Sequence, residues 1–276
     1  MSDAHDAFDP TIAGYYNRGR EATRLQRGRN QLEHLRTQEL LLRFLPPAPA
    51  VVHDVGGGAG VYALWLAEQG YTVNLLDAVP LHIEQARQAS AQQPRTPLAS
   101  VTVGDARALP FADERADAVL LFGPLYHLTE RPDRLLALRE AYRTLKPGGV
   151  LLAVGINRFT SAFDALFAGY LHDPDFRGVV DRALHDGQHR SPEGKQFFTT
   201  AFFHHPDDLR AEVEAAGFLA AELVGIEGVA WVLGDFEAAW ADPGAREWVI
   251  RLTRQLEGAP TLLGTSSHVM AVAHKT

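Results

Sequence analysis

Cysteine is absent from the 276 residues of the chain. Its absence excludes disulfide bonds, thiolate metal sites and cysteine nucleophiles, and it is typical of a cytoplasmic protein. No apolar run approaches the roughly 18 residues that a membrane-spanning helix needs. The acidic start MSDAHDAFDP also lacks the basic segment and apolar core of a signal peptide. We therefore expect a cytoplasmic protein that does not interact with membranes.

Positive charge is in the minority, because 26 Lys and Arg face 34 Asp and Glu, which gives a net charge of −8. A broad nucleic-acid-binding surface is therefore not expected. Hydrophobic residues make up 46% of the chain, which is ordinary for a globular protein with a large core. There is no internal repeat, low-complexity tract or long linker. We expect one domain over residues 1–276, as a monomer or homodimer.

Apolar runs alternate with amphipathic ones after the segment LPPAPA (45–50), which ends a helical pattern over 30–44. Strand, helix, strand, helix is typical of a doubly wound α/β fold with a mostly parallel sheet. The expected strands are 51–55, 72–76, 99–103, 118–122, 150–156, 219–226 and 267–272. The expected helices between and after them are 61–69, 81–91, 132–145, 206–216 and 243–256.

The stretch 157–205 follows the fifth predicted strand and is too long for a simple turn. We expect it to contain helices of its own. In an open sheet, ligands bind beyond the carboxyl ends of the strands, and this insertion leaves the sheet at that edge. It is therefore predicted to be a lid over the substrate, with a purely structural excursion as the alternative.

The segment HDVGGGAG places Asp54, Gly56, Gly58 and Gly60 between the first strand and the next helix. Glycines let the backbone turn sharply and approach a ligand closely, and the helix amides add partial positive charge. The dinucleotide fingerprint G-x-G-x-x-G fits only loosely, because its third glycine, counted from Gly56, falls on Val61. A tight turn without a ligand is the alternative. Asp77 ends the second strand, where a carboxylate can accept both hydroxyls of a ribose.

Three further motifs follow in order: GDARALPF, LLFGPLYHL and LKPGGVLLAVG. With DVGGGAG and Asp77 they resemble the motif set of class I S-adenosylmethionine-dependent methyltransferases, particularly the small-molecule type-11 group. The resemblance covers residues 51–156 well, and the opening helices and last two strands more loosely. It implies a Rossmann-like, seven-stranded sheet whose last strand is antiparallel, with S-adenosylmethionine as cofactor. The implied reaction is methyl transfer to N or O of a small-molecule acceptor.

The resemblance also implies residue roles. Asp54 and the backbone of Gly56 to Gly60 would hold the methionine end of the cofactor, and Asp77 its ribose. Asp105 and Ala106 would contact the adenine, while Phe122 and Gly123 would form the floor under the sulfonium. The turn at 146–149 would be structural, since it faces away from the ligand edge.

The opening residues 1–45 are expected to form a helical cap, because related methyltransferases fold an N-terminal helix over the cofactor and often present an aromatic side chain there. Tyr15 and Tyr16 are the candidates, and Tyr16 is the one we select. Packing against the domain is the alternative. The nearby arginines, Arg18, Arg20 and Arg24, are expected on a solvated face, with contact between one of them and the carboxylate of the cofactor as the alternative.

A sulfonium methyl is already electrophilic, so the protein has to position the acceptor, exclude water and remove a proton where the acceptor carries one. His127, just beyond the fourth strand, is the best candidate base, since the ordinary histidine pKa near 6.5 suits proton transfer at neutral pH. Its alternative role is to cap a helix or orient Tyr126. Tyr126 itself would position an acceptor or simply pack.

Five histidines crowd the predicted lid, and a metal site is the minority interpretation, so no metal is predicted. Glu227, after the sixth strand, either binds a cationic acceptor or makes a structural hydrogen bond. A nucleic-acid methylase is disfavoured because Phe122-Gly123-Pro124-Leu125 replaces the Asn/Asp-Pro-Pro-aromatic motif. Two other functions stay open: an NAD(P)-dependent oxidoreductase and a non-catalytic cofactor-binding protein. The lid histidines are His172, His185, His189, His204 and His205.

Overall fold

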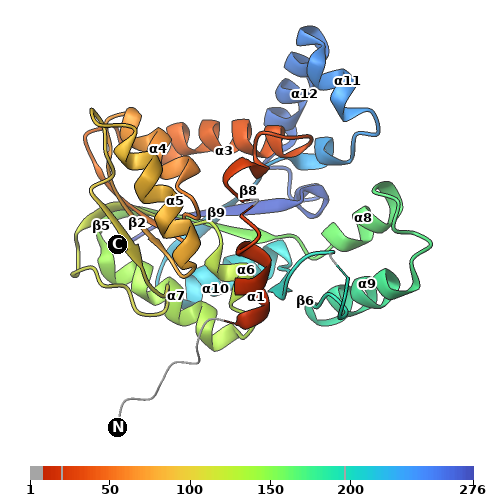
Figure 1. Cartoon of the computed structure of the whole chain (residues 1–276), viewed down its shortest axis with the longest axis horizontal. Coiled ribbons are helices and arrows are strands. Elements are labelled where there is room, and N and C mark those ends of the chain that lie inside the picture. Colours follow the sequence, from red (N-terminus) through yellow and green to blue (C-terminus); the bar gives the residue numbers. More distant parts are fainter. Residues whose placement is uncertain (1–8, 20, 196) are drawn as a thin grey trace.

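A seven-stranded sheet forms the centre of the computed structural model, which describes residues 9–19, 21–195 and 197–276 (Figure 1). The strand order is β3-β2-β1-β4-β5-β9-β8. Only β9 runs antiparallel to its neighbours β5 and β8, as the sequence predicts for the last strand. The strands are β1 (Val51–Val55), β2 (Thr72–Asp77), β3 (Ser100–Val103), β4 (Ala116–Leu121), β5 (Leu145–Ile156), β8 (Leu219–Gly225) and β9 (His268–His274).

Helices cover both faces of the sheet, so the doubly wound α/β fold is confirmed. On one face lie α3 (Asn30–Phe44), α4 (Val61–Glu68) and α5 (Pro80–Ala91), and on the other lie α7 (Arg131–Thr144) and α10 (Pro206–Ala215). The hairpin of α11 (Phe236–Ala241) and α12 (Pro243–Leu256) extends away from the sheet (Figure 1). None of the helices in the described part of the chain has the length and apolar character needed to cross a membrane.

Burial on both faces explains the unbroken apolar runs of the central strands. In β4, Ala118 and Leu120 pack toward α3, α4 and α5, whereas Val119 and Leu121 pack toward α7 and α10. All four side chains are fully buried. This double burial fixes the positions at which the strands end, and the site is built from those ends.

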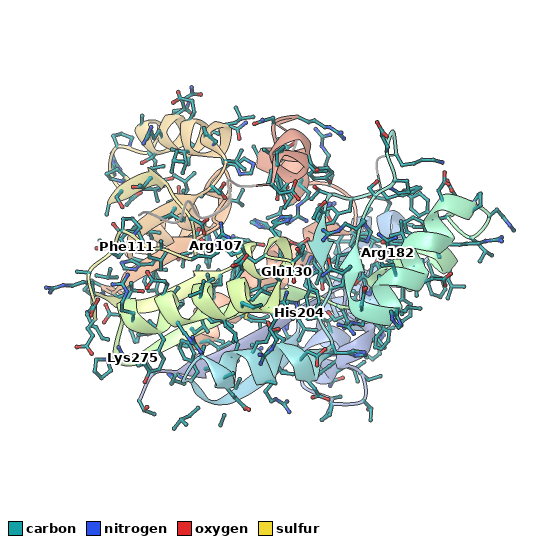
Figure 2. The ribbon with its side chains drawn as sticks, turned by 90° about the horizontal axis from the view of Figure 1, so that it is seen from below. Arg107, Phe111, Glu130, Arg182, His204 and Lys275 are labelled. Atoms are coloured by element: carbon teal, nitrogen blue, oxygen red, sulfur yellow. The ribbon has the colours of Figure 1, made fainter. Side chains whose placement is uncertain are left out.

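Helices α7 and α10 lie side by side beneath the sheet (Figure 2). A buried ion pair joins them, since Arg134 Nη2 lies 2.7 Å from Glu212 Oε1. His204 Nε2 is 3.3 Å from the same carboxylate, and the charge partners hold the pKa of Glu212 down at about 2. This histidine of the predicted lid therefore serves a structural cluster.

The predicted turn at 146–149 lies inside β5 as a bulge. Leu145 pairs with Ala116 directly after α7, and the register shifts before Ala118 pairs with Val150. Gly148 has a left-handed backbone at φ 78°, so the chain bends here, as the Pro-Gly-Gly sequence suggests. The amide of Gly148 donates to the Lys275 carbonyl, which ties the bulge to the residue that follows β9.

The insertion over 157–205 does contain helices, namely α8 (Thr160–Phe167) and α9 (Pro174–Asp186). It also contains an antiparallel pair of two-residue strands, β6 (Gln188–His189) and β7 (Ala201–Phe202). A small core joins the insertion to the end of β5, since Ala183, Ala201 and Phe203 pack with Ile156.

The opening segment contributes two short helices, α1 (Pro10–Tyr16) and α2 (Glu21–Arg24). The first eight residues of the predicted cap lie outside the described residues. In Figure 1, α1 crosses in front of the sheet, between α5 and the insertion. The short helix α6 (Pro124–His127) follows β4 at the same edge.

Candidate active site

The loop between β1 and α4 depends on glycines with left-handed backbones, at φ 78° for Gly56, 57° for Gly58 and 87° for Gly60. L-amino acids with a side chain adopt this region at a cost. A Cβ on Gly56 would lie only 2.5 Å from the Pro124 ring, so this glycine lets the loop pack against the start of α6.

Gly57 makes room for a buried carboxylate, since a Cβ there would lie 2.5 Å from Asp54 Oδ2. Asp54 is 1% exposed, and neither of its carboxylate oxygens has a hydrogen-bond partner among the described residues. Burial, helped by the charge of Asp77, raises the pKa of Asp54 to about 7. A buried carboxylate without donors indicates a ligand that brings them.

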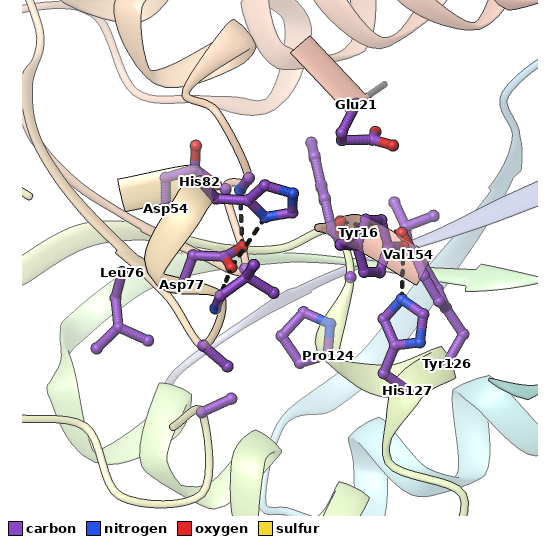
Figure 3. A pocket seen from close by; sticks show the side chains of 18 of the residues that line it. Tyr16, Glu21, Asp54, Leu76, Asp77, His82, Pro124, Tyr126, His127 and Val154 are labelled. Carbon is purple, nitrogen blue, oxygen red and sulfur yellow. Dashed lines mark hydrogen bonds and ion pairs between the residues drawn. The ribbon is translucent and has the colours of Figure 1, made fainter. Parts of the chain in front are cut away.

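Asp54 faces a cavity of about 340 Å³ at the carboxyl ends of β1, β2, β3 and β4, which we call the first cavity (Figure 3). This volume lies in the range of small-molecule sites. Nine of the ten predicted cofactor residues line the first cavity, together with both predicted catalytic residues. They are Tyr16, Asp54, Gly56, Gly58, Asp77, Asp105, Ala106, Phe122 and Gly123, with Tyr126 and His127.

Gly60 is the exception. It stands before α4 as its N-terminal flanking residue, and a Cβ there would meet Leu75 at 3.3 Å and Ala86 at 3.4 Å. Gly60 is thus packed against the core instead of facing the cavity, because the loop has already turned into the helix at this point.

Asp77 is held by three donors from its own protein. Its Oδ2 accepts from the Gly58 amide at 2.9 Å, and its Oδ1 lies 2.8 Å from the Val79 amide and 3.1 Å from His82 Nδ1. His82 is 3% exposed, and its Nε2 lacks a partner among the described residues. Figure 3 shows this imidazole beside Asp77 in the cavity wall. No motif marks His82 in the sequence, because it occupies an ordinary buried position of α5.

The end of β3 contributes Asp105, whose carboxylate pairs with Arg107 at 2.7 Å. Arg107 also reaches Asp133 at 3.1 Å, so α7 helps to fix this corner. Ala106 is buried between them. Arg107 was not among the predicted site residues, although it lines the first cavity as well.

His127 forms a hydrogen bond with Tyr16 of α1, at 2.7 Å between Nε2 and the phenolic oxygen. Its Nδ1 faces the Thr200 carbonyl at 3.4 Å. A carbonyl only accepts, so Nδ1 carries the proton and Nε2 accepts from Tyr16. Burial lowers the pKa of His127 to about 4. The imidazole is therefore neutral at pH 7 with its basic nitrogen toward the cavity (Figure 3).

Tyr126 lies beside this pair, and its hydroxyl donates to the Phe122 carbonyl at 3.3 Å. Burial raises its pKa, so the phenol stays protonated. Phe122 and Gly123 form the adjoining wall, where a Cβ on Gly123 would come 3.2 Å from the Gly56 carbonyl oxygen.

Arg24 does not lie on a solvated face as predicted, because it lines the first cavity. Its guanidinium contacts both Glu33 oxygens, at 2.6 and 2.8 Å, and Glu21 at 2.9 Å. These acidic partners, which come from α2 and α3, draw the side chain inward. Arg20 lies outside the described residues.

One group in the described ranges has metal-like spacing, namely Glu33, Glu227 and His268, with ligand atoms within 4.8 Å of one another. Its members already have partners. Glu33 is paired with Arg24, and Glu227 accepts from His268 Nδ1 at 2.6 Å and from Ser266 at 3.0 Å. Glu227 thus makes the structural hydrogen bonds that were one of its two predicted roles. None of the lid histidines belongs to the group.

A second cavity of about 340 Å³ lies between α1 and the insertion, and it shares Tyr16, Glu21, Arg24, Tyr126 and His268 with the first. Aromatic side chains form much of its wall. Four polar side chains from the insertion also line it, namely Thr160, Ser161, Asp164 and His189. The aromatic residues found only in this second cavity are Tyr15, Tyr170, Phe176, Phe197, Phe198 and Phe203.

Residues 53–153 match the family profile described as a methyltransferase domain. A ubiquinone biosynthesis O-methyltransferase of Methylobacterium nodulans is 29% identical over 184 residues, which cover 67% of this chain and 66% of that protein. Over this part of its length the chain is similar to S-adenosylmethionine-dependent methyltransferases. A ubiquinone/menaquinone biosynthesis C-methyltransferase of Ruegeria sp. is 36% identical to the chain over 121 residues, covering 42% of the chain and 47% of the relative.

The fold of the chain also matches solved structures. An S-adenosylmethionine-dependent methyltransferase from Mesorhizobium loti aligns with a TM-score of 0.58 at 17% identity, over 88% of this chain and 99% of that one. Such low identity establishes the fold alone. The curated relatives named above are matched over two thirds of their length or less. Their substrates differ in the atom methylated, so the acceptor has to be inferred from the site.

Proposed function

We propose that the chain binds S-adenosylmethionine in the first cavity and transfers the methyl group to an N or O atom of a small-molecule acceptor. The observation that carries the proposal is the buried Asp54 carboxylate beside the glycine loop, for which the described residues provide no donor. The ammonium of a methionine moiety supplies both the donors and the positive charge that this carboxylate lacks. When bound, the cofactor supplies an electrophilic methyl group on a sulfonium.

The remaining walls of the first cavity fit the rest of such a cofactor. Asp77 and the unpartnered Nε2 of His82 provide polar atoms for ribose hydroxyls. Asp105 and Ala106, at the end of β3, provide a carboxylate and a backbone edge for adenine. Gly58 has open space on the cavity side, since the nearest atom to a Cβ there would be 3.7 Å away. The backbone can therefore lie directly against the ligand.

In this proposal the Tyr16–His127 pair takes up the proton that the acceptor loses. Tyr16 passes its hydroxyl proton to Nε2 of His127 as it receives the proton of the acceptor, so the neutral imidazole becomes the final base. The tautomer and the 2.7 Å contact support this relay. The helices α1 and α2 and the insertion over 157–205 are proposed to cover the ligands and exclude water, all within one domain.

Isothermal titration calorimetry with S-adenosylhomocysteine and NADPH tests the cofactor. We expect micromolar affinity for S-adenosylhomocysteine and no heat of binding for NADPH. The reverse pattern would establish the oxidoreductase alternative. Tight binding of S-adenosylhomocysteine, with no turnover of S-adenosylmethionine on a broad metabolite panel, would instead favour a non-catalytic binding protein.

The affinity for S-adenosylhomocysteine is expected to depend on pH through Asp54. In the empty site its pKa is about 7, and the carboxylate must be ionised to hold an ammonium. Below pH 7 binding therefore releases a proton, and the Kd should rise about tenfold for each pH unit, while it stays flat between pH 7 and 8. Titrations in two buffers of different ionisation enthalpy count the proton. A Kd that is constant from pH 5.5 to 8 contradicts this role.

A further inference from the structure

The second cavity has the walls of a site for a flat ring. Phe176 stacks on Tyr170 at 4.6 Å between ring centroids and meets the edge of Phe197 at 4.7 Å. Phe198 meets Tyr15 of α1 edge-on at 5.4 Å, so the insertion and the cap close around the same space. Aromatic walls of this kind favour an aromatic ligand, through its apolar area and its ring geometry.

One polar atom in this aromatic cavity has no partner among the described residues. His189 is 3% exposed, stacks on Phe203 at 4.7 Å and places Nδ1 3.2 Å from the Ser161 hydroxyl. Its Nε2 is buried and unsatisfied. A buried nitrogen without a hydrogen bond is costly, which indicates that a ligand group completes it.

The surroundings of His189 define that ligand group. Burial lowers the pKa of His189 to about 4, so the ring is neutral at physiological pH. The Ser161 hydroxyl can donate or accept, hence Nε2 can be either an acceptor or a donor. A ligand hydroxyl can both donate and accept a hydrogen bond, so it fits either tautomer of His189. A ligand carboxylate is disfavoured, because Asp164 lines the same cavity and, with a pKa raised by burial to about 6, is largely ionised at pH 7. The cation of this wall, Arg24, is already paired with Glu21 and Glu33.

The second cavity also lies next to His127, the proposed base. Phe198 contacts the His127 ring at 6.1 Å and the His189 ring at 5.9 Å between centroids. Tyr16, whose hydroxyl is bonded to His127, lines both cavities. A ring held among these aromatics can therefore present one substituent to His189 and another to Tyr16.

We propose that the second cavity is the acceptor site and that the acceptor is an uncharged aromatic compound with at least two hydroxyl groups, one bound to His189 Nε2 and the other methylated beside Tyr16. The inference rests on the proposed function. In the transfer, the acceptor oxygen bonds to the methyl carbon while the sulfur–methyl bond breaks and leaves its electron pair on sulfur. The hydroxyl proton passes through Tyr16 to His127.

Calorimetry in saturating S-adenosylhomocysteine tests the inference with catechol, resorcinol and hydroquinone as probes, against 4-hydroxybenzoate and tyramine. We expect at least one dihydroxybenzene to bind more tightly than the anion or the cation. His189→Phe, which keeps the ring stack but removes Nε2, should weaken that probe about tenfold. The Kd of S-adenosylhomocysteine should not change. His185→Phe is the matched control, because His185 is exposed on α9, and it should leave both affinities intact. His189→Gln, which retains a polar group, should recover part of the loss.

The outcomes separate the two proposals. Failure of the wild-type protein to bind S-adenosylhomocysteine overturns the proposed function and this inference with it. Normal binding of S-adenosylhomocysteine, together with dihydroxybenzenes that fail to bind or bind His189→Phe equally well, overturns the inference alone. Preferred binding of tyramine that is lost in Asp164→Asn and kept in His189→Phe would assign the cavity to an aromatic amine instead.

Discussion

Asp54→Asn is expected to abolish measurable S-adenosylhomocysteine binding and, at the same time, to make the ligand-free protein more stable. The substitution removes the charge that would hold the ligand ammonium, yet it keeps the size of the side chain beside Gly57. It also removes a carboxylate whose ionisation is disfavoured by burial. The same group would thus be required for binding and unfavourable for folding, which is a common property of functional sites.

The stability gain has a defined pH dependence. The pKa of Asp54 is raised from 3.8 to about 7, and each unit corresponds to 1.36 kcal/mol. Because the unfolded chain ionises first, the wild-type protein loses up to about 4 kcal/mol of stability as the pH rises from 4 to 7, and the loss is complete above pH 7. Asp54→Asn should therefore exceed the wild type in urea unfolding at pH 8 and match it near pH 4.

The control for this measurement is Asp113→Asn, since Asp113 has an exposed side chain in an ion pair with Arg143. It should change neither stability nor affinity by much. An Asp54→Asn protein that is less stable at pH 8, or that binds S-adenosylhomocysteine as the wild type does, would show that the carboxylate has a partner we have not identified.

His127→Gln is expected to lower kcat by about 10²–10⁴-fold, the usual contribution of a general base, and to leave the Kd of S-adenosylhomocysteine within a few-fold. Glutamine keeps a polar side chain near Tyr16 but cannot accept a proton at neutral pH. Because burial holds the pKa of His127 near 4, the wild-type kcat should show no inflection near 6.5 and should decrease only toward pH 4. The measurement is S-adenosylhomocysteine release at saturating concentrations of both substrates.

Two further variants distinguish a base from a packing residue. Tyr16→Phe keeps the aromatic contact with His127 but removes the relay hydroxyl, so it should lower kcat as well. His172→Gln changes an exposed histidine outside both cavities and should leave kcat unchanged. Equal kcat values for His127→Gln and the wild type would leave His127 with only the packing role.

The sheet and its order of elements could be predicted because the central strands are buried on both faces and several helices begin at or next to a proline. Proline starts α7, α10 and α12 or stands one residue inside them, and the helix over 30–44 begins and ends as the leucine spacing predicts. The inclusion of the 146–149 turn in β5 could not be predicted, since it depends on pairing with Lys275, far away in the sequence.

The site was predictable where a motif lies at a strand end, as for Asp54, Asp77 and Asp105. Residues that enter from elsewhere left no comparable signal. His82 occupies a buried helix position, and Arg24 is turned inward by Glu33, a partner nine residues away. His189 was one of five histidines in a segment without clear periodicity, and its place in the wall of the second cavity depends on tertiary packing.

The seven-residue helix α1 places Tyr16 against the first cavity and Tyr15 against the second. This short helix therefore covers both cavities. A displacement of α1 that lets a ligand into one cavity would also open the other and break the hydrogen bond between Tyr16 and His127. Both ligands would then enter and leave through the same movement of α1. Turnover is expected to depend on how often α1 moves, and the rate should fall as solvent viscosity increases.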